Sequence, residues 1–214
     1  MTETKRRPPE SVQKILKFDS YVTNHFVTLV NKHFPFMNSL KMHYQALEVS
    51  CHGIPWFAFW IAFTWLFNNA HLVQMQVNML LGLTTDIIFV AVAKAYFRRK
   101  RPTANTNDPL GQMGPDIFSF PSGHASRSVF VAYFFLVLYP LHFVCYPPIL
   151  AWTTCICLSR ILMGRHYILD VLAGVCLGLF NGLLVGWLWI GQDTALWMIN
   201  YISDDKLDGG DYHV

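Results

Sequence analysis

Three short groups of residues in this sequence could together bind and cleave a phosphate ester. They are Lys94-x6-Arg101-Pro102, Pro121-Ser122-Gly123-His124 and Ser159-Arg160-x5-His166-x3-Asp170. The groups supply fixed cations for phosphoryl oxygens, one histidine that can attack phosphorus, and a second histidine that can protonate the leaving oxygen. The residue types and their spacing therefore predict phosphoryl transfer, a chemistry that needs no metal here.

The first and third groups supply three cations that could hold the oxygens of one phosphate. Lys94 and Arg101 lie seven positions apart, which is two helical turns, so their side chains project from one face of a helix. Arg160 would complete the clamp from another helix. The basic residues next to Arg101 are interpreted differently, as cations at the end of a membrane span that extend toward lipid head groups. These residues are Arg98, Arg99 and Lys100.

The second group has the composition of a helix N-terminus that binds an anion. Free backbone N–H groups and the positive end of the helix dipole favour a phosphate there, and Gly123 lets it approach the backbone. Ser122 is also a plain N-cap residue, and both interpretations can hold at once. We predict that Ser122 and Gly123 bind phosphate and that His124, beside them, gives a proton to the leaving oxygen.

The third group places an imidazole and a carboxylate on one helical face. His166 and Asp170 are four positions apart, so the carboxylate could accept a hydrogen bond from one imidazole nitrogen and leave the other free to attack. An isolated pair of this kind is more often structural, and the other groups favour the catalytic interpretation. Ser159 could donate to a phosphate oxygen or pack against a neighbouring helix, and both alternatives stay open.

Taken together, these groups resemble the motifs of the type 2 phosphatidic acid phosphatase (PAP2) superfamily, which includes bacterial acid phosphatases and vanadium haloperoxidases. The resemblance extends from Lys94 to Asp170 with every motif position filled. It implies a helical core, no cofactor, and a phosphohistidine intermediate on His166. Water activated by His124 would later hydrolyse that intermediate.

Within the superfamily, the chain is more similar to the small polyisoprenoid diphosphate phosphatases of the presqualene diphosphate type. The residues that carry this likeness are Glu48–Trp56 and Ser119–Ala125. The resemblance implies isoprenoid diphosphates and monophosphates as substrates, and a place in the endoplasmic reticulum and nuclear envelope. Two alternatives remain: a broad lipid phosphate phosphatase that acts on phosphatidate-type substrates, with six spans and a lumenal site, and a catalytically silent membrane scaffold.

Composition predicts an integral membrane protein. Of 214 residues, 53% are hydrophobic, 15% aromatic and only 14% charged, so the charged surface of a soluble protein is missing. A net charge of +3 is small for a nucleic-acid-binding protein, so we expect amphiphilic lipid substrates and membrane lipids as partners. We expect no signal peptide in Met1–Lys17, and the five cysteines fit neither a zinc site nor a disulfide framework.

Apolar runs predict an all-α, multi-pass bundle of about five spans with a PAP2/haloperoxidase-like core. The expected spans are 47–70, 77–97, 122–139, a fourth that ends near Gly164, and 168–190, the last with glycines at every fourth position. Before them, 12–36 predicts an amphipathic helix at the membrane interface. The predicted organisation is a basic N-terminal part (1–46), a phosphatase domain (47–190) and an acidic C-terminal tail (191–214) that we expect to be disordered.

Five crossings would bring all three groups to the side of the membrane that also holds the N-terminus. Of sixteen lysines and arginines, only Lys206 would lie on the opposite side, so the positive-inside bias assigns the site to the cytosol. Between the second and third spans, the loop 103–120 is long enough to act as a flap over the site. The oligomeric state is left open.

Two further polar residues lack an assigned role at this point. Asp86 is a charge within an expected span, where it would pair with a polar group of another helix or lie near the phosphate site. His52 could line the entrance to the site, although an interfacial histidine beside Trp56 is the simpler interpretation. The other histidines show no metal-binding spacing, and we assign no metal ligands.

Overall fold

The computed structural model describes residues 9–67, 69–102 and 117–202, and these ranges form helices without a β-strand. The expected all-α class is confirmed. The α-helices are α1 (Glu10–His33), α2 (Lys41–Ser50), α3 (Gly53–Leu66), α4 (Ala70–Phe97), α5 (Gly123–Tyr133), α6 (Tyr146–Leu162), α7 (Ile168–Trp187) and α8 (Gln192–Ile202). Shorter helical segments are η1 (Pro35–Leu40), η3 (Phe134–Leu138) and η4 (Phe143–Cys145).

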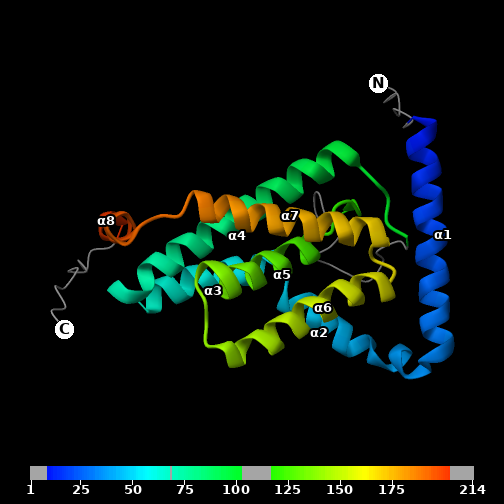
Figure 1. Ribbon diagram of the computed structural model, residues 1–214, viewed down its shortest axis with the longest axis horizontal. Coiled ribbons are helices and arrows are strands. Elements are labelled where there is room, and N and C mark those ends of the chain that lie inside the picture. The colour runs from blue at the N-terminus through cyan, green and yellow to red at the C-terminus, as the bar shows by residue number, and fades with distance from the viewer. Residues whose placement is uncertain (1–8, 68, 103–116, 203–214) are drawn as a thin grey trace.

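Most helices run along the long axis of the molecule, whereas α1 stands across one end of the bundle, where it contacts α6 and α7 (Figure 1). Three of the described helical segments are long and apolar enough to cross a membrane: α4, η4 with α6, and α7. The first expected span is the bent pair α2–α3, which turns by 48°. The third is the shorter apolar segment Gly123–Leu138, formed by α5 and η3.

Local sequence explains where the longest helix begins and ends. The side chain of Asn69 accepts a 2.9 Å hydrogen bond from the backbone N–H of His71 and caps α4, which begins at Ala70, seven residues before the predicted start at 77. Arg98, with φ 48°, adopts the left-handed conformation that ends the helix. The end of α4 therefore lies where Lys94 and Arg101 flank a turn.

Glycines bring α7 into close contact with α5, as their spacing predicted. A Cβ atom on Gly174 would lie 2.5 Å from the carbonyl oxygen of Ser122, and one on Gly178 would lie 2.3 Å from that of Ser126. Only glycine allows backbones to approach so closely. This contact holds the N-terminus of α5 against the first turns of α7.

The polar residue Asp86 has partners inside the bundle. Its carboxylate accepts a 2.5 Å hydrogen bond from Ser126 Oγ and pairs with Arg127 at 3.1 Å, while Arg127 also donates to the carbonyl oxygen of Cys51 (3.0 Å). Of the two alternatives for Asp86, the structure therefore shows pairing across helices. This network joins α4 and α5 to the break between α2 and α3.

The C-terminal boundary differs from the prediction. Residues 192–202, expected in a tail without order, form α8, and Ala195 packs in a buried apolar cluster with Val73 and Val77 of α4. Burial of apolar side chains stabilises this segment as a helix, although the residues after it are acidic. The rest of the tail, 203–214, lies outside the described residues, as do 1–8 and most of the loop predicted as a flap.

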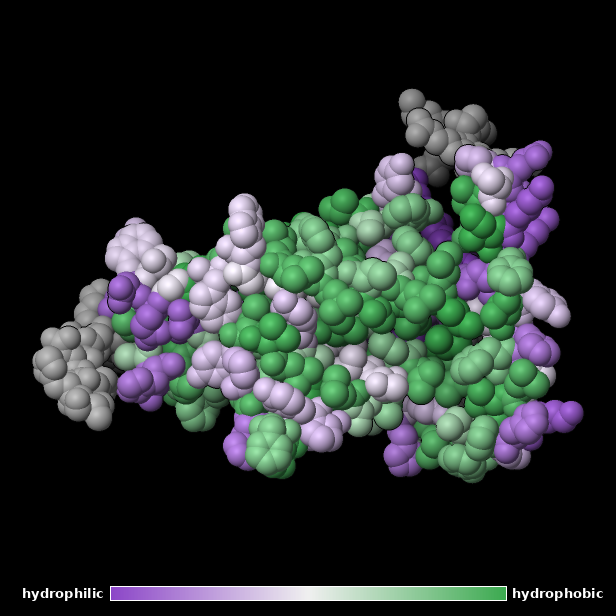
Figure 2. Space-filling model, in the orientation of Figure 1, coloured by the Kyte–Doolittle hydropathy of each residue, from purple (hydrophilic) through white to green (hydrophobic). Residues whose placement is uncertain are grey.

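The surface supports a place within lipid. A broad hydrophobic region covers the middle of the face in Figure 2, and hydrophilic residues gather mainly toward the two ends of the molecule. Large apolar side chains are exposed on the long helices, among them Ile88, Val92, Phe180 and Leu183. Such a surface is costly in water and favourable in hydrocarbon, so the chain is an integral membrane protein.

Candidate active site

His166 lies in the turn between α6 and α7 and is almost fully buried, with 2% of its surface exposed. Its Nδ1 donates a 2.7 Å hydrogen bond to the backbone carbonyl oxygen of Ser119. Because a carbonyl oxygen only accepts, the proton is on Nδ1 and Nε2 keeps its lone pair. The nearest Asp170 oxygen is 3.8 Å from Nδ1, beyond hydrogen-bond distance. The Ser119 carbonyl, rather than the predicted Asp170 carboxylate, therefore fixes the tautomer.

Burial lowers the pKa of His166 well below its ordinary value, and the nearby charges of Arg101, Lys94 and Arg160 lower it further. The imidazole is consequently neutral at physiological pH. All three predicted phosphate-binding cations thus act on one ring, although Lys94 comes from the last turn of α4, Arg101 from the segment after that helix and Arg160 from α6. The prediction that Lys94 and Arg101 project from one helical face is wrong, because α4 ends at Phe97. The structure brings these residues to one place.

Asp170 has other partners. Its Oδ2 accepts a 2.9 Å hydrogen bond from the backbone N–H of Tyr167, and its Oδ1 pairs with Arg99 Nη1 at 2.6 Å. The carboxylate therefore caps the first turn of α7 and is neutralised by a cation that sequence analysis had assigned to lipid head groups. That assignment of Arg99 is wrong, because only 10% of its side chain is exposed.

The turn predicted to bind an anion lies against the same end of α7. Ser122 is the N-cap of α5, its Oγ accepts from the N–H of Ala125 at 3.4 Å, and its own N–H donates to the carbonyl oxygen of Asp170 at 2.9 Å. Ser122 and Gly123 are both buried. The second and third sequence groups thus meet through a direct backbone hydrogen bond.

His124 and Arg160 both contact Glu48 of α2. His124 Nε2 donates a 3.1 Å hydrogen bond to the Glu48 carbonyl oxygen, and Arg160 Nη1 pairs with the Glu48 carboxylate at 2.8 Å. Arg160 is also close enough to interact electrostatically with both His124 and His166. Both histidines therefore lie near one arginine, as the predicted phosphate site needs.

Ser159 does not face this group of residues as a free donor. Its Oγ donates to the carbonyl oxygen of Ile156 at 2.8 Å and lies 3.4 Å from Arg160 Nε. Both contacts lie within α6, so neither alternative for Ser159 is decided by them.

The sequence model of the PAP2 superfamily matches residues 76–194, more than half of the chain. The chain belongs to the PAP2 superfamily. A relative named "Probable lipid phosphate phosphatase beta", from Arabidopsis thaliana, is 38% identical over 132 residues, which cover 50% of this chain and 62% of the relative. This PAP2 chain therefore spans less than two thirds of that relative's length.

Two solved PAP2-like structures share the fold. The crystal structure of Aquifex aeolicus LpxE has a TM-score of 0.56 at 20% identity and covers 75% of this chain and 92% of its own. That of the first transmembrane PAP2 type phosphatidylglycerolphosphate phosphatase from Bacillus subtilis has a TM-score of 0.58 at 24% identity and covers 82% and 86%. At these identities the likeness establishes the PAP2 fold of the helical bundle.

Sequence reasoning gave no role to one PAP2 site neighbour, Glu48 of α2, and left two alternatives for another, His52 in the turn after α2. Glu48 pairs with Arg160, and the ring of His52 lies 6.0 Å from that of His124 with its Nδ1 buried and without a hydrogen-bond partner. The entrance role of His52 therefore gains support over the simple interfacial one. A signal was present, because an acid and a histidine stand beside the apolar run that follows them.

Metal ligands are not gathered anywhere in the part of the PAP2 chain that the structure describes. No group of three or more histidine, cysteine, aspartate or glutamate side chains there could hold an ion. The polar centre of the site is instead built from cations and two imidazoles.

Proposed function

We propose that this PAP2 chain is a membrane phosphohydrolase that removes phosphate from isoprenoid diphosphates and monophosphates such as farnesyl, geranylgeranyl and presqualene diphosphate. The observation that carries the proposal is the 2.7 Å hydrogen bond from His166 Nδ1 to Ser119, which leaves Nε2 unprotonated among cations. A neutral imidazole beside fixed positive charges is suited to attack on phosphorus.

In the first step, His166 Nε2 attacks phosphorus and forms a P–N bond while the bond from phosphorus to the leaving oxygen breaks. Protonated His124 gives its proton to that oxygen, which departs on an isoprenoid alcohol or an isoprenoid monophosphate. Lys94, Arg101 and Arg160 neutralise the charge on the three remaining phosphoryl oxygens. The product of this step is a phosphohistidine.

In the second step, water attacks the phosphohistidine and the P–N bond breaks. His124, now neutral, takes the proton from water, so inorganic phosphate leaves and His166 returns to its neutral form. The N-terminus of α5 at Gly123 would bind the phosphate throughout, while the Ser122 N–H stays bonded to the Asp170 carbonyl oxygen. Asp170 stabilises the positive charge that develops on the imidazole. Water is the only co-reactant that the cycle requires.

Apolar helices support an amphiphilic substrate, because the phosphate could occupy the polar site while its tail lies among lipid-facing side chains. We propose that the site faces the cytosol, in the endoplasmic reticulum and nuclear envelope. The distribution of lysine and arginine supports this orientation. Glycosylation of an acceptor site inserted into the loop 103–120 would place the site on the lumenal side and contradict the cytosolic orientation. The position of a fluorescent fusion protein in the cell would test the proposed organelle.

The decisive experiment measures phosphate release from farnesyl diphosphate in detergent with a chelator present. Native chain should turn over, His166→Ala should be inactive, and His124→Ala should be slowed but still bind vanadate, a mimic of five-coordinate phosphorus. Equal rates for native chain and His166→Ala would leave only the scaffold alternative. Vanadate without effect at high concentration would contradict the phosphate site.

A second candidate is a broad lipid phosphate phosphatase, which is favoured by the name of the Arabidopsis thaliana relative. A substrate panel separates the two. The isoprenoid proposal expects a higher kcat/KM for isoprenoid diphosphates and their monophosphates than for phosphatidate. A preference for phosphatidate would support the alternative.

A further inference from the structure

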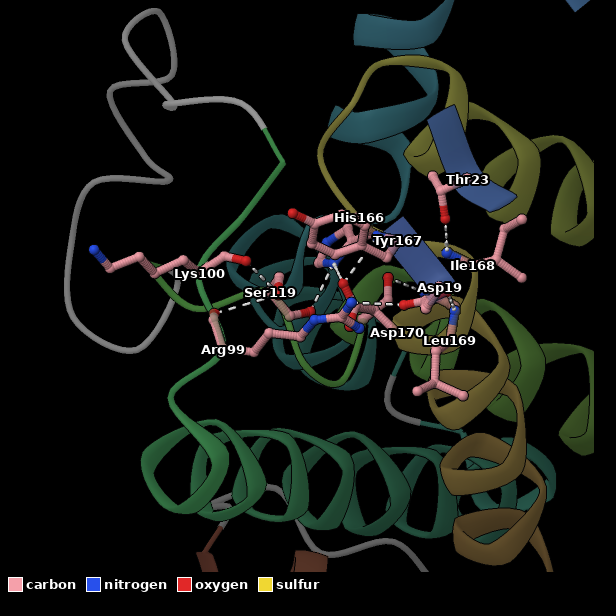
Figure 3. Close-up of polar contacts among 12 residues, drawn as sticks. Asp19, Thr23, Arg99, Lys100, Ser119, His166, Tyr167, Ile168, Leu169 and Asp170 are labelled. Carbon is pink, nitrogen blue, oxygen red and sulfur yellow. Dashed lines mark hydrogen bonds and ion pairs between the residues drawn. The ribbon is translucent and has the colours of Figure 1, made fainter. Parts of the chain in front are cut away.

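Arg99 joins two carboxylates that come from opposite ends of the sequence. Its Nη1 pairs with Asp170 and its Nη2 with Asp19 of α1, both at 2.6 Å (Figure 3). The guanidinium carbon lies 4.0 Å from the centre of the Tyr167 ring, and both aspartate side chains are buried or nearly so. A planar guanidinium stacked on a ring and shared by two acids has one well-defined position.

The same helix α1 also holds the start of α7. Asp19 Oδ1 accepts a 3.0 Å hydrogen bond from the N–H of Leu169, and Thr23 Oγ1 accepts a 3.1 Å bond from that of Ile168 (Figure 3). The first turn of a helix has N–H groups without partners in that helix. Here α1 supplies those partners, although about 150 residues separate the two segments.

The contacts of Arg99 extend to the residues around the proposed nucleophile, His166. Asp170, which Arg99 holds, caps Tyr167 and lies 3.8 Å from His166 Nδ1. The backbone carbonyl oxygen of Arg99 also accepts a 2.8 Å hydrogen bond from the N–H of Ser119, and the Ser119 carbonyl oxygen in turn accepts from His166 Nδ1. Arg99 therefore connects to the hydrogen-bond acceptor of the imidazole through its main chain, and to the nearby Asp170 carboxylate through its side chain.

We propose that Arg99 and Asp19 are positioning residues for the phosphatase reaction, and that α1 thereby helps to orient the active-site residues. This inference rests on the function proposed above. Helix α1 lies outside residues 76–194 that match the PAP2 superfamily model, so Asp19 reaches the matched core from another part of the chain. Small displacements of a reacting group cost large factors in rate, which explains why a helix would be fixed at this point.

The test compares Asp19→Asn and Arg99→Gln with Glu10→Gln, which removes an exposed acid from the same helix. For Asp19→Asn and Arg99→Gln, kcat with farnesyl diphosphate should fall about 10- to 100-fold while KM and vanadate inhibition stay within about twofold. Glu10→Gln should match the native chain. Arg99→Lys keeps the positive charge but loses the planar guanidinium that binds Asp19 and Asp170 together. Its kcat should therefore lie between those of the native chain and Arg99→Gln.

A pH profile distinguishes positioning from general loss of structure. Without Arg99, the Asp170 carboxylate faces His166 without its cation and raises the pKa of the imidazole, so the acid limb of kcat moves to higher pH. Partial unfolding lowers the amount of active protein and leaves that limb in place. The charged and titratable groups around His166 are kept constant in this comparison. They are Lys94, Arg101, His124, Arg160 and Asp170.

Each outcome has one meaning. An inactive native chain would overturn the proposed function itself. An active native chain with an unchanged kcat in Asp19→Asn and Arg99→Gln would overturn the positioning role alone. The same holds if the two variants lose vanadate inhibition together with kcat. If Arg99→Gln does not fold, Arg99→Lys and Thr23→Val take its place, and a native kcat in both would end the inference.

Discussion

The imidazole of His166 donates its 2.7 Å hydrogen bond to the main chain of Ser119, 47 residues earlier in the sequence. Ser119 stands three residues before Ser122, the N-cap of α5. One short segment therefore both orients the proposed nucleophile and leads into the helix end that is suited to bind phosphate. A backbone acceptor has the advantage that no side-chain substitution at Ser119 removes it.

The acid limb of activity should lie well below the ordinary histidine range. Attack needs neutral His166, and its lowered pKa keeps it neutral as the pH falls through about 6.5. Arg101→Gln removes one of the charges that lower this pKa, so the limb should move to higher pH. Initial rates between pH 4 and pH 8 measure this, and a limb unchanged in Arg101→Gln contradicts it.

The same pKa predicts acid destabilisation of the fold. The unfolded chain binds a proton at about pH 6.5 and folded His166 only at a lower pH, so stability is full above that value and falls as the pH drops toward the folded pKa. His166→Gln should show a weaker loss over this window. Thermal unfolding in detergent at several pH values provides the measurement, with His213→Gln as control.

Phosphate has to compete with Glu48 for Arg160, because the two side chains pair at 2.8 Å. In Glu48→Gln, vanadate should inhibit about 3- to 10-fold more strongly, since the competing charge is gone. Thermal stability should fall, because buried Arg160 loses its partner. Vanadate inhibition that is unchanged or weaker would contradict the competition, and Glu10→Gln is the matched control.

The buried pair of Asp86 and Arg127 should matter for stability. Asp86→Leu leaves Arg127 without its partner and should cost about 3–5 kcal/mol, while the double variant with Arg127→Leu should recover part of that loss. Thermal unfolding in detergent tests both. Thr84→Ala, at an exposed position two residues earlier in α4, should stay within about 0.5 kcal/mol.

Close contact between α5 and α7 should make Gly178→Ala harmful. The new Cβ would lie 2.3 Å from the Ser126 carbonyl oxygen, so α5 must move and stability should fall by about 1–3 kcal/mol. Activity should fall with it, because His124 lies at the start of α5. Gly191→Ala has nothing within 4 Å of its Cβ and should behave like the native chain. Equal melting temperatures would count against this contact.

Spacing along single helices carried most of what could be predicted. Ser122 caps α5 and the glycines of α7 meet α5, because each pattern depends on helix geometry over a few residues. The helical spacing of Lys94 and Arg101 failed, because α4 ends at Phe97. Span ends were less predictable. The break at Cys51 and His52, and the packed helix α8, lie in segments where apolar composition alone does not show a bend or a boundary.

The sequence by itself determined the chemical groups, their order and the superfamily, since these depend on residue identity and local spacing. Only the tertiary structure decided the partners. Ser119 rather than Asp170 accepts from His166, and Arg99 pairs with Asp19 and Asp170 instead of facing lipid. Such contacts join segments up to 150 residues apart, and their geometry is set by how helices pack, which no local spacing specifies.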